Sequence, residues 1–238
     1  AAAGELQTTN VIYLYSGATG APLGHLPNTE PNGRFGTAIS TAGDVDGNGT
    51  EDILVGQPPN FLLAGRGRVW VYSGATGAIL HRFTGADTRD DDFGVAVSRA
   101  GDVDGDGYED VAAGAPGDSS HGHDDGGSVT IYSGATGAPI WTIPGDQQDQ
   151  GLGASVAEVG DVDGDGRLDL IAGTTHWLSQ NQEAFLYSLA VDPYLYATGA
   201  SLSAQTGGRV DFVFDFPSSE AGRTYALLGS MTGTGTWN

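Results

Sequence analysis

Cysteine is absent from this chain of 238 residues. No disulfide can therefore stabilise its fold, and no thiol can serve as a nucleophile or a metal ligand. The absence does not exclude secretion, because bound metal ions can supply the cross-links that disulfides provide in other proteins.

Positive charge is scarce. The nine basic residues are all arginine, the acidic residues number 30, and the formal net charge is −21. Nucleic acid is therefore a poor partner, because binding to phosphates needs a basic surface. We expect a strongly acidic, soluble and self-repelling surface.

Long apolar runs and sustained helical periods are missing as well. No stretch approaches the roughly 18 apolar residues of a membrane-spanning helix, so we expect no membrane span. The 40 glycines and the short apolar runs predict many short strands joined by tight turns. The chain begins Ala1-Ala2-Ala3, without an initiator Met or an apolar signal core, which indicates a mature or excised segment.

An acidic stretch of nine residues occurs three times, at residues 44–52, 102–110 and 161–169. In each copy an oxygen-bearing side chain stands at positions 1, 3, 5 and 9, and glycine stands at positions 4 and 6. Carboxylates this close repel one another. A hard divalent cation with many oxygen ligands, best Ca²⁺, would turn that repulsion into attraction. The glycine at position 6 allows the sharp turn that folds the ligands around the ion.

A single copy could equally be a solvated Asp-Gly turn, but three copies in register favour metal binding. We expect about three Ca²⁺ ions, bound by side-chain oxygens of positions 1, 3 and 5, the backbone carbonyl of position 7 and the carboxylate of position 9. The expected ligand residues are Asp44, Asp46, Asn48, Thr50 and Asp52 in the first copy, Asp102, Asp104, Asp106, Tyr108 and Asp110 in the second, and Asp161, Asp163, Asp165, Arg167 and Asp169 in the third.

The three expected sites differ in charge. Asn48 gives the first site one negative charge fewer, which predicts that it is the weakest. Asn48-Gly49-Thr50 also matches an N-glycosylation acceptor. Because one side chain cannot comfortably serve as both ligand and glycan anchor, we favour the ligand.

A second repeated element, Tyr-Ser-Gly-Ala-Thr-Gly-Ala, begins at Tyr15, Tyr72 and Tyr132. Both elements recur with a period of about 60 residues, which in a chain rich in strand and turn residues indicates a propeller or solenoid array. Within one period we expect a strand, the acidic loop, two further strands, the Ser-Gly turn and a fourth strand. Four antiparallel strands make one propeller blade. In the second period the strands are predicted at residues 93–98, 111–116, 128–132 and 139–143.

The residues that flank the acidic loops resemble a known repeat. Phe35-Gly36 precedes the first loop and Gly56-Gln57-Pro58 follows it, while Phe93-Gly94 and Gly114-Ala115-Pro116 flank the second. This arrangement resembles the FG-GAP repeat of integrin α-subunit β-propellers and of related bacterial secreted proteins. The resemblance implies that the loop between the first two strands of each blade binds Ca²⁺.

The third copy of this motif is degenerate. Leu152-Gly153 replaces Phe-Gly, and Gly173-Thr174-Thr175 replaces Gly-Ala-Pro. The resemblance nevertheless extends over about residues 11–190. Integrin propellers have seven blades, so this chain is either a fragment or has open sheet edges that another copy completes.

The chain is therefore predicted to be all-β, with two regions. Residues 1–188 are expected to form FG-GAP β-propeller-like blades, and residues 189–238 a β-rich segment, a small sheet or sandwich in which Phe212, Phe214 and Phe216 share one face. The blade region comprises a half-unit near 11–26 and units near 35–83, 93–143 and 152–188.

Other candidate sites carry weaker signals. His121-Gly122-His123-Asp124-Asp125 could bind a transition metal, but a polar loop tip is the favoured interpretation. Asp90-Asp91-Asp92 is expected to be an exposed acidic loop, and Trp70 and Trp141 are expected to pack in the core. No nucleophile elbow, phosphate loop or His-Glu-x-x-His motif occurs, so we do not expect an enzyme.

These observations favour a secreted or cell-surface, non-catalytic module that is stabilised by Ca²⁺. Weak Ca²⁺ modules work at ~10⁻⁴–10⁻³ M, which suits an extracellular fluid. One hypothesis is self-assembly through incomplete β edges into a polymer or surface layer. Another, by analogy with integrins, is adhesion to a protein or glycan through the propeller loops. A non-catalytic domain of a larger enzyme is a third, weaker possibility.

Overall fold

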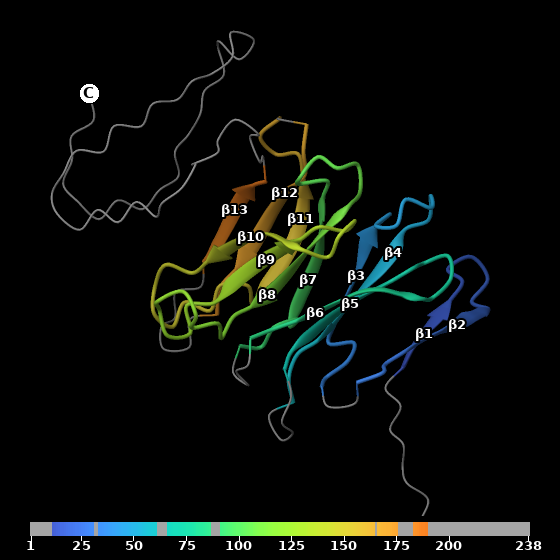
Figure 1. Cartoon of the computed structure of the whole chain (residues 1–238), viewed down its shortest axis with the longest axis horizontal. Helices are drawn as coiled ribbons and strands as arrows, with labels where there is room; N and C mark the ends of the chain where they lie inside the picture. Colours follow the sequence, from blue (N-terminus) through green and yellow to red (C-terminus); the bar gives the residue numbers. More distant parts are fainter. Residues whose placement is uncertain are drawn as a thin grey trace, which may run out of the picture. The chain divides into compact units, whose positions relative to one another are not determined.

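The computed structural model describes residues 11–30, 33–60, 66–86, 91–164, 166–175 and 183–189. These residues form thirteen strands in four antiparallel sheets and no helix, which confirms the predicted all-β fold (Figure 1). None of the described residues belongs to a helix long and apolar enough to cross a membrane. The predicted segment at residues 189–238 lies outside the described residues, apart from Leu189.

The first sheet has two strands, β1 (Val11–Tyr15) and β2 (Pro22–Pro27). The turn between them is closed by hydrogen bonds from Ser16 N–H to the Ala21 carbonyl at 2.8 Å and from Gly20 N–H to the Ser16 carbonyl at 2.7 Å. Gly20 has a φ of 71°, a left-handed conformation that glycine adopts without strain. The half-unit predicted near residues 11–26 is therefore a two-stranded hairpin.

The second and third sheets each have four strands in chain order, as predicted for one blade. The second sheet consists of β3 (Ala38–Gly43), β4 (Asp52–Gln57), β5 (Arg68–Tyr72) and β6 (Ile79–Thr84). The third consists of β7 (Ala96–Gly101), β8 (Asp110–Ala115), β9 (Ser128–Tyr132) and β10 (Pro139–Pro144).

The prediction for the first strand of the third sheet was wrong at its start. Phe93 and Gly94 precede β7 and form a turn, in which Val95 N–H donates to the Asp92 carbonyl at 3.1 Å and Gly94 has a φ of 86°. The apolar Phe93 resembled a strand residue because it is buried, but it is buried between sheets.

The fourth sheet consists of β11 (Ser155–Gly160), β12 (Asp169–Gly173) and β13 (Ala184–Ser188). Its three strands again follow chain order. Within the described part of the chain, the four sheets do not close into a ring.

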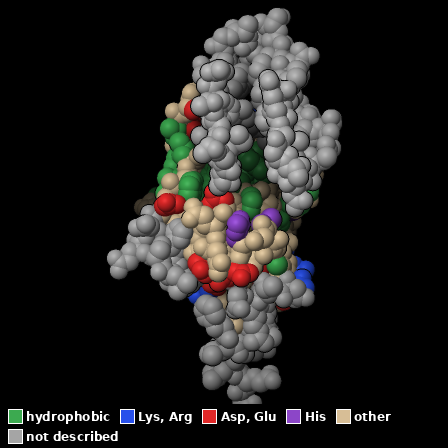
Figure 2. Space-filling view, turned by 90° about the vertical axis from the view of Figure 1, so that its left-hand side faces the viewer, with side chains coloured by type: hydrophobic (Ala, Val, Ile, Leu, Met, Phe, Trp, Pro, Cys, Tyr) green, Lys and Arg blue, Asp and Glu red, His purple; other side chains and the backbone are tan. Residues whose placement is uncertain are grey.

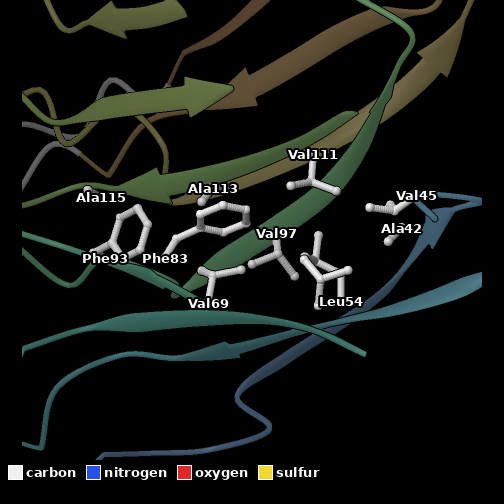
Figure 3. Packing of buried hydrophobic residues seen from close by; sticks show 11 residues of the cluster. Ala42, Val45, Leu54, Val69, Phe83, Phe93, Val97, Val111, Ala113 and Ala115 are labelled. Atoms are coloured by element: carbon white, nitrogen blue, oxygen red, sulfur yellow. The ribbon is translucent and has the colours of Figure 1, made fainter. Parts of the chain in front are cut away.

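Neighbouring sheets pack face to face through side chains that alternate along the strands. Leu54, Val69 and Phe83 of the second sheet meet residues of the third in one buried cluster (Figure 3). The Phe83 and Tyr132 rings stack across this joint with centroids 4.2 Å apart. A second cluster joins the third sheet to the fourth, and a third joins the β1–β2 hairpin to the second sheet.

Glycine in the flanking motifs permits this close approach. A Cβ atom at Gly56 would overlap the backbone carbonyl of Gly94, and one at Gly114 would overlap that of Gly153. The Phe-Gly turn of one repeat thus lies against the Gly-x-Pro segment of the repeat before it. The glycines of the motif therefore allow the backbones of successive sheets to pack closely.

Two expectations about individual side chains were wrong. Trp70 is buried as predicted, but Trp141, on the outermost strand β10, is exposed. Asp91 is buried rather than exposed, since it lies beneath Phe93 and Gly85. Neither outcome follows from strand alternation, because both depend on which neighbouring segment covers the residue.

Candidate metal-binding loops

Each acidic stretch forms the loop between the first and second strands of its sheet. The loops connect β3 to β4, β7 to β8 and β11 to β12. Position 9 of each stretch, Asp52, Asp110 or Asp169, is the first residue of the second strand.

The folded loops bring carboxylates together in three separate groups. Within each group, one carboxylate oxygen per residue lies within 4.8 Å of the others. The groups are Asp44, Asp46 and Asp52; Asp102, Asp104 and Asp106; and Asp161, Asp163 and Asp169. Position 9 belongs to the first and third groups, whereas position 5 takes its place in the second. Asp165 lies outside the described residues.

The position-1 carboxylate organises each loop. Asp102 accepts hydrogen bonds from Gly105 N–H at 2.7 Å and from Gly107 N–H at 2.9 Å. Both glycines have positive φ, 78° and 92°, which explains why positions 4 and 6 are glycine. Asp161 makes the equivalent bonds at 2.6 and 2.8 Å. The loops are therefore curled around their own acidic side chains.

The position-9 carboxylate has a second, structural role. Asp110 accepts hydrogen bonds from Val103 N–H at 2.7 Å and from Gly134 N–H at 2.9 Å. Asp52 does the same with the corresponding Val45 and Gly74, both at 2.9 Å. Each bond to glycine ties the acidic loop to the Ser-Gly turn after the third strand. Sequence reasoning missed this link, although the joint recurrence of the two elements was a usable signal.

The third copy lacks half of this link. Asp169 accepts from Val162 N–H at 2.8 Å, but its Oδ1 atom is buried without a hydrogen-bond partner. The position that corresponds to Gly74 and Gly134 is Leu189. The degenerate sequence of this repeat thus coincides with a less satisfied carboxylate.

Burial disfavours ionisation of Asp110 and Asp52. It raises the pKa of Asp110 to about 6, with a further contribution from the Asp104 charge, and hydrogen bonds from Gly134 and Val103 partly oppose the rise. Burial likewise raises the pKa of Asp52. A cation in the loop would favour the charged carboxylate and oppose both rises.

The loops also contribute to the joints between sheets. Position 2, Val45 in the first loop and Val103 in the second, is buried in the core between its own sheet and the next. The Tyr108 ring of the second loop packs on Gly47 of the first. Arg167 of the third loop donates to the Val103 carbonyl of the second at 2.9 Å. Adjacent loops are therefore in direct contact.

The donor set fits a hard cation. All the clustered side chains offer carboxylate oxygen, and neither nitrogen nor sulfur is among them. Six to eight oxygen ligands suit Ca²⁺, and flexible surface loops suit it better than the strict octahedron of Mg²⁺. The backbone carbonyls of Thr50, Tyr108 and Arg167 would supply further oxygens from position 7.

The loop that contains His121 and His123 does not bring together a comparable set of metal ligands. His121 Nδ1 lies 3.2 Å from an Asp118 carboxylate oxygen and 3.0 Å from the Ser120 hydroxyl. Histidine side chains are visible beside acidic ones on this face (Figure 2). Among the residues described, however, His121 and His123 join no group of three clustered ligands. The favoured interpretation as a polar loop tip agrees with this geometry.

A charged pair that sequence reasoning missed links the first strands of the third and fourth sheets. Arg99 on β7 donates to the Glu158 carboxylate on β11 at 3.0 Å. Ser98 Oγ also accepts from Glu158 N–H at 2.9 Å. The hydrogen bond to Glu158 raises the pKa of Arg99.

Comparison with known proteins matches two stretches of this sequence to a repeat family. A family model described as the FG-GAP repeat matches residues 35–72 and 93–132. Each match runs from the Phe-Gly turn to the end of the third strand, and so includes one whole acidic loop.

Several integrin α subunits are similar to this chain. Integrin alpha-4 of Xenopus laevis is 36% identical over 150 residues, which cover 58% of this chain and 14% of that protein. Integrin alpha-6 of Homo sapiens is 37% identical over 107 residues, 42% of this chain and 9% of that protein. Integrin alpha-E of Mus musculus is 34% identical over 156 residues, 59% of this chain and 13% of that protein.

The chain thus spans only a small part of the length of these relatives. The family-model matches at residues 35–72 and 93–132 include both Phe-Gly turns and the first two acidic loops. This chain therefore carries FG-GAP repeats, and it is similar to integrin α subunits.

Proposed function

We propose that this chain is a non-catalytic, extracellular module whose acidic loops each bind Ca²⁺ and thereby hold neighbouring β-sheets together. The position of the loops carries this proposal. Val45 and Val103 anchor their loops in the inter-sheet cores, while Asp52 and Asp110 bond to the turns after the third strands. An ion that orders a loop would therefore stabilise a joint between sheets.

Electrostatics gives the direction of the effect. Three carboxylates within 4.8 Å of one another repel in a chain of net charge −21. An ion that binds only the folded loops stabilises the native state by an amount that grows with its concentration. Exposed loops of this kind suit the millimolar Ca²⁺ of extracellular fluids.

Thermal unfolding with added Ca²⁺ or with a chelator tests the proposal. We expect a higher melting temperature with Ca²⁺, a smaller rise with Mg²⁺, and one ion per loop by calorimetry. Asp102→Ala should abolish one site, whereas Asp124→Asn, at an exposed acid outside the loops, should leave all of them. An unchanged melt after chelation would exclude a stabilising ion.

Self-association is the finer part of the proposed role. Among the described strands, β1 pairs only with β2 and β13 pairs only with β12, so each presents one free edge. Such edges and the faces beside them are surfaces on which copies can assemble into a polymer or surface layer. Light scattering over a concentration series tests this, since a constant monomer mass would contradict it.

Adhesion is the second candidate function, and the similarity to integrin α subunits favours it. The ligand would be a protein or glycan held by the loops between strands, several of which are exposed. Binding of the monomeric chain to a glycan array or to immobilised extracellular proteins, lost in loop variants, would support this candidate. Binding only by assembled copies would favour self-association.

A further inference from the structure

The outer face of the fourth sheet exposes positions that are buried in the other two joints. In the second and third sheets, the residues that face the next sheet are covered: Val45 and Val103 are each 2% exposed, and Val71 and Ile131 are each 0%. The equivalent residues of the fourth sheet, Val162 and Leu186, are 57% and 45% exposed. Register places them at the same points of the repeat, because Ile53 pairs with Tyr72 and Leu170 pairs with Tyr187.

This outer face carries no charged side chain on its two flanking strands. The outward residues of β11 are Ser155, Ala157 and Val159, of which Val159 is 41% exposed, and those of β13 are Ala184, Leu186 and Ser188. In the third sheet the residues that match those of β11 are Ala96, Ser98 and Ala100, all buried. Small uncharged residues allow sheets to approach closely, and an exposed apolar face in so acidic a chain indicates an interface.

At the other end of the series of sheets, the β1–β2 hairpin also exposes residues whose equivalents are buried between sheets. Tyr13 and Tyr15 on β1 are 66% and 62% exposed. Tyr13 corresponds to Trp70, and Tyr15 to Tyr72 and Tyr132. Both Trp70 and Tyr72 are buried against the preceding hairpin.

We propose that these two faces bind each other between copies of this chain, head to tail. The outer face of β11–β13 of one copy docks against Tyr13 and Tyr15 of the next. The chain builds the same joint twice within itself, from the second sheet to the third and from the third to the fourth, so the two exposed faces already have matching chemistry. Such a contact is heterologous and leaves a free face at each end, so it adds further copies unless the rotation between copies closes a ring.

This inference rests on the self-association part of the proposed function and makes it specific. It assigns assembly to apolar sheet faces rather than to hydrogen bonding between strand edges. The net charge of −21 opposes approach of two copies, so added salt and bound Ca²⁺ should both strengthen the contact.

Complementation between two variants tests the polarity of the contact. Val159→Asp with Leu186→Asp disables one face, and Tyr13→Asp with Tyr15→Asp disables the other. In light scattering at increasing concentration, we expect the wild type to associate and each variant alone to remain monomeric, with association at least tenfold weaker. An equimolar mixture should form dimers, because one intact face remains on each partner.

Ile79→Asp is the matched control, since Ile79 is an exposed apolar residue of the second sheet. It should associate like the wild type, and circular dichroism should show that all variants keep their β structure. A mixture that stays monomeric would overturn the pairing of these two faces. Variants that still associate would overturn the face-to-face assignment while leaving self-association through edges intact. A monomeric wild type would overturn both, without affecting the Ca²⁺ proposal, which the melt tests separately.

The absence of cysteine allows a direct check of proximity. Val71, the internal equivalent of Leu186, lies in the buried cluster against which Tyr132, the equivalent of Tyr15, packs. A bifunctional thiol cross-linker should therefore join Tyr15→Cys to Leu186→Cys in a mixture and should join neither variant to itself. Equal cross-linking of either variant alone would contradict a head-to-tail contact.

Discussion

The Oδ1 atom of Asp110 accepts a hydrogen bond of 2.9 Å from Gly134 N–H, 24 residues later in the chain. This bond joins the two repeated elements, the acidic loop and the Tyr-Ser-Gly turn, at the point where the loop meets the second strand. Asp52 and Gly74 repeat it at 2.9 Å. The candidate metal ligands Asp110 and Asp52 therefore also link two segments of their own sheets.

Asp110→Ala should destabilise the fold even without metal. Three hydrogen bonds to a buried carboxylate are lost, those from Val103, Asp104 and Gly134, which predicts a decrease of roughly 2–4 kcal/mol in the free energy of unfolding. Urea denaturation in a chelator measures the effect without a contribution from bound ions. Asp169→Ala should cost less, because Asp169 Oδ1 has no partner to lose. Equal losses of stability in Asp110→Ala and Asp169→Ala would contradict this structural role.

Alanine substitutions in the Ser-Gly turns should differ strongly between repeats. At Gly134 a Cβ atom would overlap the Glu109 carbonyl, and at Gly74 it would overlap the Glu51 carbonyl. At Gly17, the equivalent residue of the first hairpin, it would meet nothing within 4 Å. We expect Gly134→Ala to cost about 2 kcal/mol or more through displacement of the backbone and Gly17→Ala to be nearly neutral. Thermal denaturation of the two variants makes the comparison.

Replacement of Asp91 should stabilise the protein at neutral pH. Burial raises the pKa of Asp91 to about 6 from 3.8, and the charges of Asp118 and Asp92 add to the rise. The folded state therefore retains a proton that the unfolded chain loses, so this residue makes the protein less stable as the pH rises from about 4 to about 6. Gln150, buried at the equivalent position, shows that an amide fits there.

Asp91→Gln should accordingly melt higher than the wild type at about pH 7.5 and lose most of that advantage by about pH 4, close to the unfolded pKa of 3.8, below which Asp91 is protonated in both states. Melting temperatures across this range, measured in a chelator, provide the test. Asp124→Asn, at an exposed acid, should show no such dependence on pH. A gain for Asp91→Gln that did not change with pH would rule out titration of Asp91 as its cause.

The charge of position 5 should set the relative affinities of the loops. Asn48→Asp gives the first loop the charge of the second, and we expect about a tenfold gain in its Ca²⁺ affinity. Asp106→Asn makes the reverse change in the second loop and should weaken it by a similar factor. Calorimetric titration of the wild type and of both variants tests this. A wild type whose first loop binds Ca²⁺ most tightly would contradict the charge argument.

Local patterns sufficed for the acidic loops, for their place between the first two strands of three sheets, and for most strands, although Phe93 and Gly94 were wrongly included in one. Alternation along a strand depends on adjacent residues, and the positive φ of Gly105 and Gly107 belongs to the loop itself. Repetition supplied the rest, because the same two elements recur with the Phe-Gly and Gly-x-Pro segments that the FG-GAP family model matches.

Contacts between sheets could not be predicted from local patterns or from repetition. The burial of Asp91, the exposure of Trp141 and the bond from Gly134 to Asp110 each depend on a segment far away in the chain. The same holds for Tyr15 and Leu186, whose equivalents are buried in internal joints while they themselves are exposed. The sequence by itself determined the repeated unit, because its periods and turns are local. Only the tertiary structure decided which faces are covered, because coverage depends on the neighbouring sheet.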